Sequence, residues 1–489
     1  MERTVRFLLN DEMSRVTLPS GLAVLDLLRR ERRLTGTREG CREGDCGACL
    51  VLLGEPREGA VRYRPVNSCL LPVGELEGRH LVTIEGLNPP LGPGPAPALN
   101  PIQRSFVEEG ATQCGFCTPG FIVALTGYFL GNPAPDPETA QDAVAGNLCR
   151  CTGYASIRRA IDRLLEQHRA LPPAALLERC VGWGIVPAWL AEAPARLAAL
   201  REPGPGTASV AAPIGGGVLV AGGTDLFVQR PEALQDAPLI FLSERDLSRT
   251  WVRDGRRFLG ATLPMEDLCG VSPFAAYLSC VASGPVRQRA TVGGNLVNAS
   301  PIGDFTIMLL ALGASLGIRG PTSLSGSAPA AMRELALEDF YRGYKKLDLA
   351  EGEVVEWVAF PEPGEAGFHF EKVGRRQHLD IASVNTAALL RLAPGRILEA
   401  RLSAGGVAPV PLLLRRTSEY LSGREAGPQT LARSLALAQE EIAPISDVRG
   451  SAEYKRRLLK RLLVAHFLRL LPQALSSEAA VALLAGGAA

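Results

Sequence analysis

The stretch REGCREGDCGACLV, residues 38–51, carries three of the chain's eleven cysteines and decides how its first part folds. A fourth cysteine follows further on, so the pattern is C-x4-C-x2-C-x19-C at Cys41, Cys46, Cys49 and Cys69. Three thiolates so close in sequence can reach one common centre only if the loop folds back sharply. Glycine permits the backbone angles that such a loop needs, and the loop has it at Gly40, Gly44 and Gly47. The pattern therefore predicts one metal–sulfur centre in a tight loop.

The spacing of these cysteines is typical of plant-type ferredoxins, which hold a [2Fe–2S] cluster. The preceding residues support that prediction, because apolar residues alternate over 5–9 and return at 16–18 after a polar turn, as in a β-hairpin. Residues 22–33 have apolar positions at helical spacing and end in a basic turn. A zinc site and free thiols are the alternatives at this point.

Four further cysteines form a second pattern, C-x2-C-x31-C-x1-C, at Cys114, Cys117, Cys149 and Cys151. This is not ferredoxin spacing, and four cysteines alone fit an iron–sulfur cluster or zinc. Cys117 immediately precedes Thr118-Pro119, a helix start, and Cys151 precedes the next predicted helix. Helix N-termini would stabilise the negative charge of an iron–sulfur cluster there.

The composition limits the classes of protein to which the chain can belong. At 489 residues, with 46% hydrophobic and 21% charged residues, the chain is expected to be a multidomain globular protein. A net charge of +1 gives no electrostatic reason to expect nucleic acid or an anionic membrane as partner. No signal peptide or membrane-spanning run is visible, so we expect a cytoplasmic protein whose cysteines are metal ligands or buried thiols.

Proline and glycine mark the boundaries along the chain. A Pro-rich linker is predicted from Asn88 to Ala98, and four short helices follow between about 101 and 168. A second Pro- and Ala-rich stretch, 171–213, contains an apparent helix around 189–201. Beyond it we expect a larger α/β domain and then, from about 368 to 475, strands followed by helices.

Three strings together carry a resemblance to a known family: REGCREGDCGACLV, TQCGFCTPGF and GNLCRCTGYASI. They resemble the iron–sulfur segment of the xanthine oxidase family of molybdenum hydroxylases. There a β-grasp ferredoxin domain precedes a four-helix domain whose cluster lies nearest the molybdenum. The resemblance implies two [2Fe–2S] clusters, the outer one on the first four cysteines and the inner one on the second four. Cys180, Cys269 and Cys280 are isolated and are expected to be buried thiols.

Two glycine-rich elements follow, LVAGGTDL at 219–226 and TVGGN at 291–295. Backbone amides at such turns can approach a pyrophosphate, but neither is G-x-G-x-x-G, so a Rossmann fold is not supported. Together they resemble the FAD domain of the same hydroxylases, shared with the vanillyl-alcohol oxidase type of flavoprotein. The resemblance implies that these residues line the pyrophosphate and ribityl chain: Leu219, Val220, Ala221, Gly222, Gly223, Thr224, Asp225, Leu226, Thr291, Val292, Gly293, Gly294 and Asn295.

The same resemblance assigns three single residues to the flavin. Asp304 would bind a hydroxyl of the cofactor, and Val355 and Lys372 would lie near the isoalloxazine. The alternatives are a core valine and a solvated lysine. Two departures from the family stand out. Val281 stands where relatives commonly have a phenylalanine that stacks on the flavin, which bears on FAD binding. Leu379 stands in a segment that is acidic in animal relatives, which bears on the electron acceptor.

The predicted architecture is a multidomain α+β chain with four domains. These are a plant-type ferredoxin-like β-grasp [2Fe–2S] domain at 1–87, a helical [2Fe–2S]-binding domain at 99–170, a vanillyl-alcohol-oxidase-type FAD-binding domain at 184–362, and a C-terminal α+β flavoprotein domain at 366–475.

The resemblance implies an oxidoreductase subunit of purine catabolism. Electrons from a molybdenum cofactor on a partner chain would pass through both clusters to FAD and then to NAD, as in xanthine oxidation. The partner would be a molybdopterin-binding large subunit in an α2β2 heterotetramer, because nothing here is left over to form a purine pocket. Alternatives are the equivalent subunit of a hydroxylase acting on aldehydes or N-heterocycles, and a zinc-stabilised assembly scaffold. No catalytic residue is expected on this chain.

Overall fold

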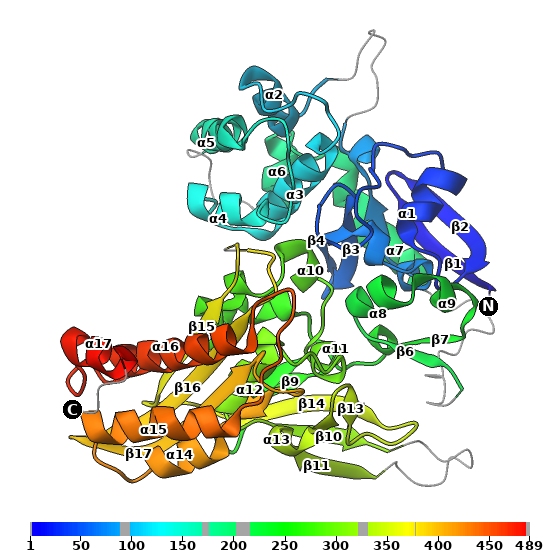
Figure 1. Ribbon diagram of the computed structural model, residues 1–489. Helices are drawn as coiled ribbons and strands as arrows, with labels where there is room; N and C mark the ends of the chain where they lie inside the picture. The colour runs from blue at the N-terminus through cyan, green and yellow to red at the C-terminus, as the bar shows by residue number, and fades with distance from the viewer. Residues whose placement is uncertain are drawn as a thin grey trace. The chain divides into compact units, whose positions relative to one another are not determined.

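The computed structural model describes residues 2–88, 98–168, 176–201, 216–320, 331–376 and 378–485. They form two compact units. The first unit contains the described residues up to 201 together with 216–245 and 283–290, and the second contains 246–282 and the described residues from 291 onward. Figure 1 labels the elements of both units. Residues of the predicted flavin domain, 184–362, contribute to both, while 89–97 of the first predicted linker lie outside the described residues.

The first unit begins with a five-stranded sheet in the order β2-β1-β5-β3-β4, the arrangement of a β-grasp fold. The first two strands are the predicted hairpin, and β1 pairs in parallel with β5. The strands are β1 Glu2–Leu9, β2 Glu12–Pro19, β3 Leu50–Arg57, β4 Ala60–Asn67 and β5 His80–Val82. Alternate residues of these strands, such as Val5 and Phe7, are fully buried in one core.

The helix predicted for residues 22–33 is shorter and more irregular than expected. It consists of α1, Val24–Asp26, followed by a π-helical turn over Leu27–Glu31. Both Leu27 and Leu28 reach the core of the sheet through this wider turn. Arg29 then donates hydrogen bonds to the carbonyl groups of Thr35 and Thr37, which holds the chain at the entrance to the cysteine loop.

The four helices predicted between 101 and 168 are confirmed. They are α2 Pro101–Glu108, α3 Thr118–Gly131, α4 Pro137–Ala143 and α5 Ala155–His168. Asn100 and Gln103 form a capping box at α2, and the Asp136 carboxylate accepts two backbone N–H groups at the start of α4, as the Asn-Pro and Asp-Pro pairs predict. Helix α3 is buried along most of its length, and its core includes Leu50 and Leu52 of β3.

The rest of the first unit packs on these two domains. Ile185 and Leu190 join the helical core, and Leu197 packs against Leu8 of β1, so the predicted start of the flavin domain at 184 falls inside a packed segment. The remaining elements are α6 Leu176–Gly182, α7 Ala193–Arg201, β6 Val218–Val220, α8 Thr224–Gln229, α9 Pro231–Asp236, β7 Leu239–Phe241 and α10 Gly284–Arg287.

The second unit contains two larger sheets, ordered β11-β10-β14-β9-β8 and β15-β16-β17-β18, and the small pair β12-β13. The strands are β8 Thr250–Arg253, β9 Arg256–Gly260, β10 Ser315–Arg319, β11 Met332–Ala336, β12 Tyr341–Gly343, β13 Lys346–Leu347, β14 Val354–Pro361, β15 Gly367–Val373, β16 Val384–Ala393, β17 Arg396–Gly405 and β18 Leu412–Leu413. The helices are α11 Val292–Val297, α12 Asp304–Ala311, α13 Leu337–Phe340, α14 Arg415–Leu421, α15 Pro428–Glu441, α16 Ala452–Leu470 and α17 Ser477–Ala485.

The sheet β15–β18 is covered on both faces. Helix α12 lies on one face, where Ser403 donates to the carbonyl group of Ile307. Helix α16 lies on the other face, where Thr386 contacts His466 and alternate residues of β16 join the apolar core, as Figure 1 shows for the sheet and α16. Alternation along each strand therefore decides which side chains face α12 and which face α16.

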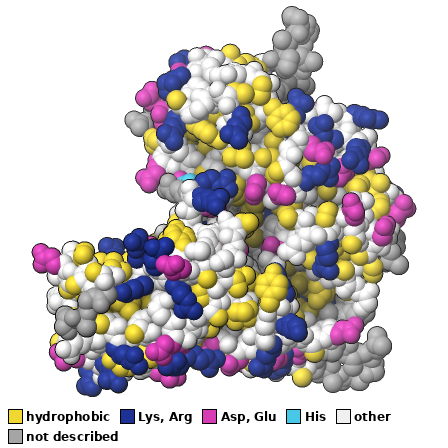
Figure 2. All heavy atoms as spheres, in the orientation of Figure 1, with side chains coloured by type: hydrophobic (Ala, Val, Ile, Leu, Met, Phe, Trp, Pro, Cys, Tyr) yellow, Lys and Arg dark blue, Asp and Glu magenta, His cyan; other side chains and the backbone are white. Residues whose placement is uncertain are grey.

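Among the described residues, no helix is long and apolar enough to span a bilayer. On the face drawn in Figure 2, Lys and Arg side chains are interspersed with Asp and Glu side chains, in keeping with the net charge of +1.

Candidate cofactor sites

The first four cysteines come together around the loop between the π-helical turn and β3. Cys69 is in a short 3-10 turn after β4, and its sulfur lies 3.4 Å from that of Cys49. Cys41 and Cys46 share a second thiol–thiol hydrogen bond. The N–H of Glu43 points at the Cys41 sulfur at 3.3 Å, and Gly47 adopts a positive φ of 64° that lets the loop fold back.

Within each of these pairs one thiol is ready to ionise. The hydrogen bond shared with Cys46, aided by backbone N–H groups, lowers the pKa of Cys41 to about 5. The hydrogen bond shared with Cys69 lowers the pKa of Cys49 to about 7, although burial opposes it. The pKa values of Cys46 and Cys69 are raised by the same two hydrogen bonds. Because thiolates are the form that binds metal, the loop favours metal ligation.

The second four cysteines form the same arrangement of two pairs. The sulfur of Cys151 lies 3.5 Å from that of Cys114, and Cys117 shares a hydrogen bond with Cys149. Cys117 caps the N-terminus of α3, as predicted, which brings the positive end of that helix dipole to the pair. Burial raises the pKa of Cys117 to about 12, whereas the hydroxyl of Thr152, 3.1 Å from the Cys149 sulfur, helps to lower that of Cys149 against the effect of burial.

Pairing distinguishes a diiron cluster from a mononuclear site. Each iron of a [2Fe–2S] cluster is bound by two bridging sulfides and two thiolates, so the ligands must come in two pairs. A structural zinc ion instead needs all four thiolates around one point. Both sets of cysteines are arranged as two thiol pairs, which is the arrangement that a [2Fe–2S] cluster requires.

The two cysteine loops also contact each other directly. The N–H of Leu148 donates to the carbonyl group of Cys46 at 3.0 Å, and the side-chain amide of Asn147 donates to the carbonyl group of Gly47, also at 3.0 Å. Cys46, a predicted ligand of the first set, is thus joined by one hydrogen bond to Leu148, the residue before Cys149 of the second set. Sequence analysis did not single out Asn147, although it stands in the string that carried the resemblance.

The first glycine-rich element lies in the first unit. β6 pairs in parallel with β7, and the turn after it contains Gly223 with φ of 77° at the start of α8. Gly222 has no room for a side chain, because a Cβ atom there would lie 2.0 Å from the carbonyl oxygen of Arg289. The glycine at position 222 is therefore required by the close packing of this turn against the backbone at Arg289.

The second glycine-rich element lies in the second unit. Thr291 caps α11 and its hydroxyl accepts the N–H of Gly294 at 3.1 Å. The N–H of Gly293 donates to the carbonyl group of Ala261 at 2.8 Å, which holds the start of the helix against the end of β9. Because the two glycine-rich elements belong to different units, the geometry of each is established only within its own unit.

The three single flavin residues also lie in the second unit, and two of them are joined. Asp304, at the start of α12, accepts from Lys372 at 2.7 Å and from Asn385 at 2.5 Å. Burial raises the pKa of Asp304, and Lys372 opposes that rise. Lys372 is therefore buried and paired, so the alternative of a solvated lysine is wrong. Val355, on β14, is 4% exposed and is a core residue. Its predicted position near the flavin remains a prediction.

The other cysteines and Val281 differ in exposure. Cys180 is fully buried, as predicted, but Cys269 is exposed, because it lies at the surface end of a 3-10 turn. Val281 is 5% exposed, so a larger side chain there would have to displace its neighbours.

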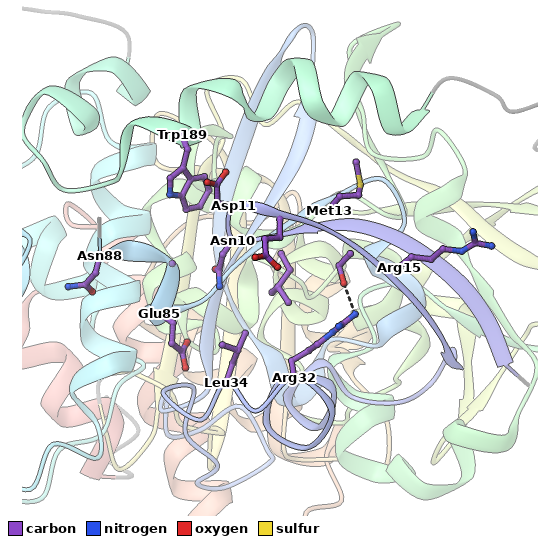
Figure 3. A pocket seen from close by; sticks show the side chains of 13 residues that line it. Asn10, Asp11, Met13, Arg15, Arg32, Leu34, Glu85, Asn88 and Trp189 are labelled. Atoms are coloured by element: carbon purple, nitrogen blue, oxygen red, sulfur yellow. Dashed lines mark hydrogen bonds between the residues drawn. The ribbon is translucent and has the colours of Figure 1, made fainter. Parts of the chain in front are cut away.

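Two polar features contain none of the predicted cofactor residues. A cavity of about 680 Å³ adjoins the β1–β2 turn, and Figure 3 shows Trp189, Asp11 and Arg32 among its lining.

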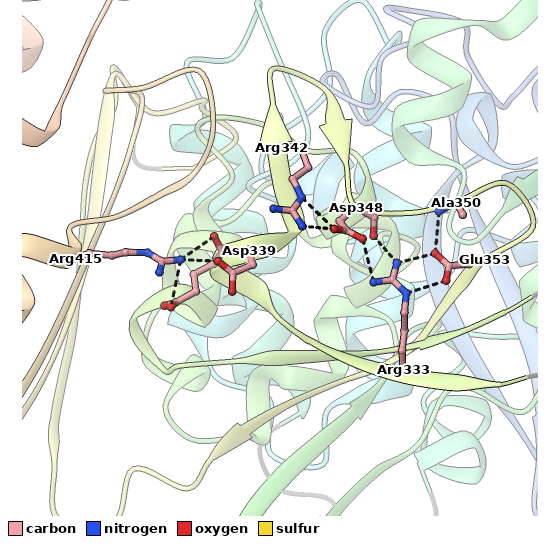
Figure 4. Close-up of polar contacts among 8 residues, drawn as sticks. Arg333, Asp339, Arg342, Asp348, Ala350, Glu353 and Arg415 are labelled. Carbon is pink, nitrogen blue, oxygen red and sulfur yellow. Dashed lines mark hydrogen bonds and ion pairs between the residues drawn. The ribbon is translucent and has the colours of Figure 1, made fainter.

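In the second unit, Arg333 pairs with Glu353 at 2.7 Å and Arg415 with Asp339 at 2.7 Å, as Figure 4 shows. These are partly exposed ion pairs, which typically add ~0–1 kcal/mol each. Arg415–Asp339 links α14 to α13, and Arg333–Glu353 links β11 to the residue before β14.

Four known domain families match the chain in sequence. They are a 2Fe-2S iron-sulfur cluster binding domain at 8–74, a [2Fe-2S] binding domain at 83–162, an FAD binding domain in molybdopterin dehydrogenase at 208–363, and a CO dehydrogenase flavoprotein C-terminal domain at 368–470.

Whole proteins that resemble the chain are longer than it. Xanthine dehydrogenase 1 of Arabidopsis thaliana is 28% identical over 93% of this chain and 39% of its own length. Aldehyde oxidase 1 of Oryctolagus cuniculus is 25% identical over 91% of this chain and 38% of its own length. Among solved structures, a chain of quinoline 2-oxidoreductase from Pseudomonas putida 86 is 28% identical, with a TM-score of 0.45 over 53% of this chain and 90% of that chain. The chain thus spans about two fifths of the length of these curated relatives.

Proposed function

We propose that this chain, which belongs to the xanthine oxidase family of molybdenum hydroxylases by its four domains, is the electron-transfer subunit of a larger oxidoreductase. The observation that carries the proposal is the arrangement of eight cysteines as two sets of two thiol pairs. The ligands would be Cys41, Cys46, Cys49 and Cys69 for one cluster and Cys114, Cys117, Cys149 and Cys151 for the other.

The residues proposed to hold FAD are those of the two glycine-rich elements with Asp304, Val355 and Lys372. In the first element, the tight turn at Gly222 and Gly223 would bring the backbone close to the diphosphate. In the second element, the N–H groups of Val292, Gly293 and Gly294 already donate within the protein, so this element would contribute its compact shape rather than free donors. When bound, the two clusters would carry single electrons and the flavin would pair them for a two-electron acceptor.

The clusters would lie close to one another because their loops are bonded. The hydrogen bond from Leu148 to the carbonyl group of Cys46 links the two ligand sets, and Asn147 fixes the same contact through Gly47. This chain's own contribution is then to hold the two ligand sets in a fixed relation and to keep Cys49 and Cys69 away from water, at 2% and 5% exposure.

We further propose xanthine as the substrate and NAD as the acceptor. The resemblance to xanthine dehydrogenases over 93% of this chain supports the substrate, which a molybdopterin-binding large subunit would bind in an α2β2 complex. The similarity to an aldehyde oxidase supports a second candidate, the same redox role in an aldehyde-oxidising enzyme. Leu379 stands in a segment that is acidic in animal relatives. This difference bears on whether NAD or another molecule accepts the electrons.

The test separates the role of this chain from that of its partner. The isolated full chain should pass electrons from NADH to ferricyanide and should not oxidise xanthine, whereas addition of the large subunit should give xanthine-to-NAD turnover. Cys149→Ser should abolish the reconstituted turnover and spare the NADH-to-ferricyanide reaction. The reverse pattern would contradict the proposed order of centres. Failure of NADH to reduce bound flavin would instead indicate oxygen or quinone as acceptor.

A further inference from the structure

Residues 283–290 lie between the two glycine-rich elements in sequence, but they pack among the iron–sulfur domains of the first unit. A Cβ atom at Gly44 of the first cysteine loop would lie 3.1 Å from Val286. A Cβ atom at Gly146, before Cys149, would lie 2.9 Å from Ser283. This one short segment, which includes α10, therefore contacts both cysteine loops.

Arg289, near the end of the segment, joins it to the first glycine-rich turn. Its Nη2 donates to the carbonyl group of Gly222 at 3.2 Å, and its own carbonyl oxygen closes the space beside the Gly222 Cα. Its Nη1 lies 3.5 Å from the carboxylate of Glu75, a residue of the β-grasp domain. Both side chains are buried, at 8% and 0% exposure.

Arg289 belongs to a buried cluster of five charged side chains. Arg79 pairs with both Glu75 and Glu55, and Arg64 pairs with Glu55 at 3.5 Å. The pKa of each carboxyl group is lowered by these arginines against the effect of burial, so both carry negative charge. Three positive charges therefore face two negative ones. At the edge of this cluster, Glu244 pairs instead with Arg3, at 2.8 Å.

Two of these arginines carry a buried Nε that makes no hydrogen bond among the described residues, Arg64 and Arg289. Arg289 is distinguished by its guanidinium, which also contacts the Gly222 turn. A buried donor without a partner costs free energy comparable to a lost hydrogen bond, and a buried charge requires a counter-charge. Of the contacts that Arg289 makes, the one with Gly222 leads to the predicted diphosphate turn.

We propose that Arg289 is a positioning residue for the flavin: Glu75 anchors it, it holds the Gly222 turn, and it supplies positive charge for an anionic diphosphate. This inference rests on the proposed function and extends it, because it makes FAD binding depend on a side chain anchored in the β-grasp domain. Arg289 lies outside both glycine-rich motifs, and the family resemblance did not single it out.

The test compares Arg289→Met with Arg64→Met in the full chain. Arg64 belongs to the same buried cluster, where its guanidinium contacts Glu55 and Gln288. After reversible removal of flavin, FAD is titrated by fluorescence quenching at low and high salt, and iron content is measured in parallel. Arg289→Met should weaken FAD binding by about 10- to 100-fold and reduce its salt dependence, with iron content unchanged. Arg64→Met should lower the melting temperature but leave FAD affinity within about twofold of wild type.

Equal FAD affinities for the two methionine variants would overturn the inference. Should Arg289→Met fail to fold, Arg289→Lys, which keeps the charge but loses the planar fork, should bind FAD with intermediate affinity and keep the salt dependence. Wild-type FAD affinity in Arg289→Lys would then count against the proposed role of Arg289. A wild-type chain that binds no FAD would defeat the proposed function itself, whereas normal wild-type binding with an unaffected Arg289→Met defeats only the role of Arg289.

Discussion

Lys372 and Asp304 form a buried ion pair, with 2.7 Å between Nζ and Oδ2 and side chains only 8% and 10% exposed. Lys372 pairs in register with Asn385 on β16, and both point to the face of the sheet that α12 covers, where Asp304 begins that helix. Lys372 also donates to the carbonyl group of Cys280 at 2.6 Å. The pair thus joins β15, α12 and the segment before α10.

Removing one partner of this pair should be strongly destabilising. Lys372→Met leaves the Asp304 carboxylate buried with only Asn385 as a side-chain donor, so the free energy of unfolding should fall by about 3–5 kcal/mol. Urea unfolding of the full chain at pH 7, followed by circular dichroism, measures the change. Lys346→Met is the control, because Lys346 is exposed on β13 and should change stability by about 0.5 kcal/mol or less.

The double variant Lys372→Met/Asp304→Asn gives a second check on the pair. Neutralising the stranded carboxylate should recover part of the lost stability, since the cost comes from an unpaired buried charge. Additive losses in the double variant would show that the two side chains are not coupled.

Acid should destabilise the second unit through His466. Its Nδ1 lies 2.9 Å from Nδ1 of His369 and its Nε2 lies 2.8 Å from the hydroxyl of Thr386, so only one hydrogen fits between the two rings. Burial, together with the facing His369, lowers the pKa of His466 to about 3. The unfolded chain takes up the proton near pH 6.5, so the stability is complete above that pH and about 2 kcal/mol of it should be lost by pH 5.

The measurement is the free energy of unfolding between pH 7 and pH 5 for wild type and His466→Gln. The variant should be less stable at pH 7 but should show a flatter pH dependence. His378→Gln, at a histidine hydrogen-bonded to the carbonyl group of Ser279, should keep the wild-type slope. An unchanged slope in His466→Gln would rule out His466 as the source.

The sequence was sufficient for those parts of the fold that depend on local chemistry. The loop glycines, the Asn-Pro and Asp-Pro helix starts and the strand alternation at 5–9 each specify their own conformation, and the hairpin and the four helices are found as predicted. Cys41, Cys46, Cys49 and Cys69 could be grouped because their spacing alone limits where the thiols can lie. The proposed domain boundaries remain predictions.

Long-range partners could not be predicted in the same way. Arg289 and Glu75 are more than 200 residues apart in sequence, and nothing near either residue indicates that they meet. Lys372 and Asp304 were each assigned to the flavin, yet their mutual contact depends on the packing of α12 against the face of the sheet where Lys372 and Asn385 lie. The π-helical turn at 27–31 also departs from its helical periodicity, because packing of two adjacent leucines outweighed the local pattern.

Single cysteine substitutions should each remove one cluster and spare the other. Cys151→Ser breaks the pair with Cys114, and Cys41→Ser breaks the pair with Cys46, so each variant should keep about half of the wild-type iron. Electron paramagnetic resonance of the dithionite-reduced proteins should show a different remaining signal in each variant. Loss of all iron from either variant would indicate that the two sets do not bind clusters independently.

The central claim is that this chain holds two [2Fe–2S] clusters and one flavin for electron transfer, and an anaerobic reductive titration tests it most directly. The purified full chain should take up about four electrons from dithionite, one for each cluster and two for the flavin, with bleaching of the visible absorption. Iron and acid-labile sulfide should be present in equal amounts. Bound zinc without labile sulfide, and no electron uptake, would contradict the account.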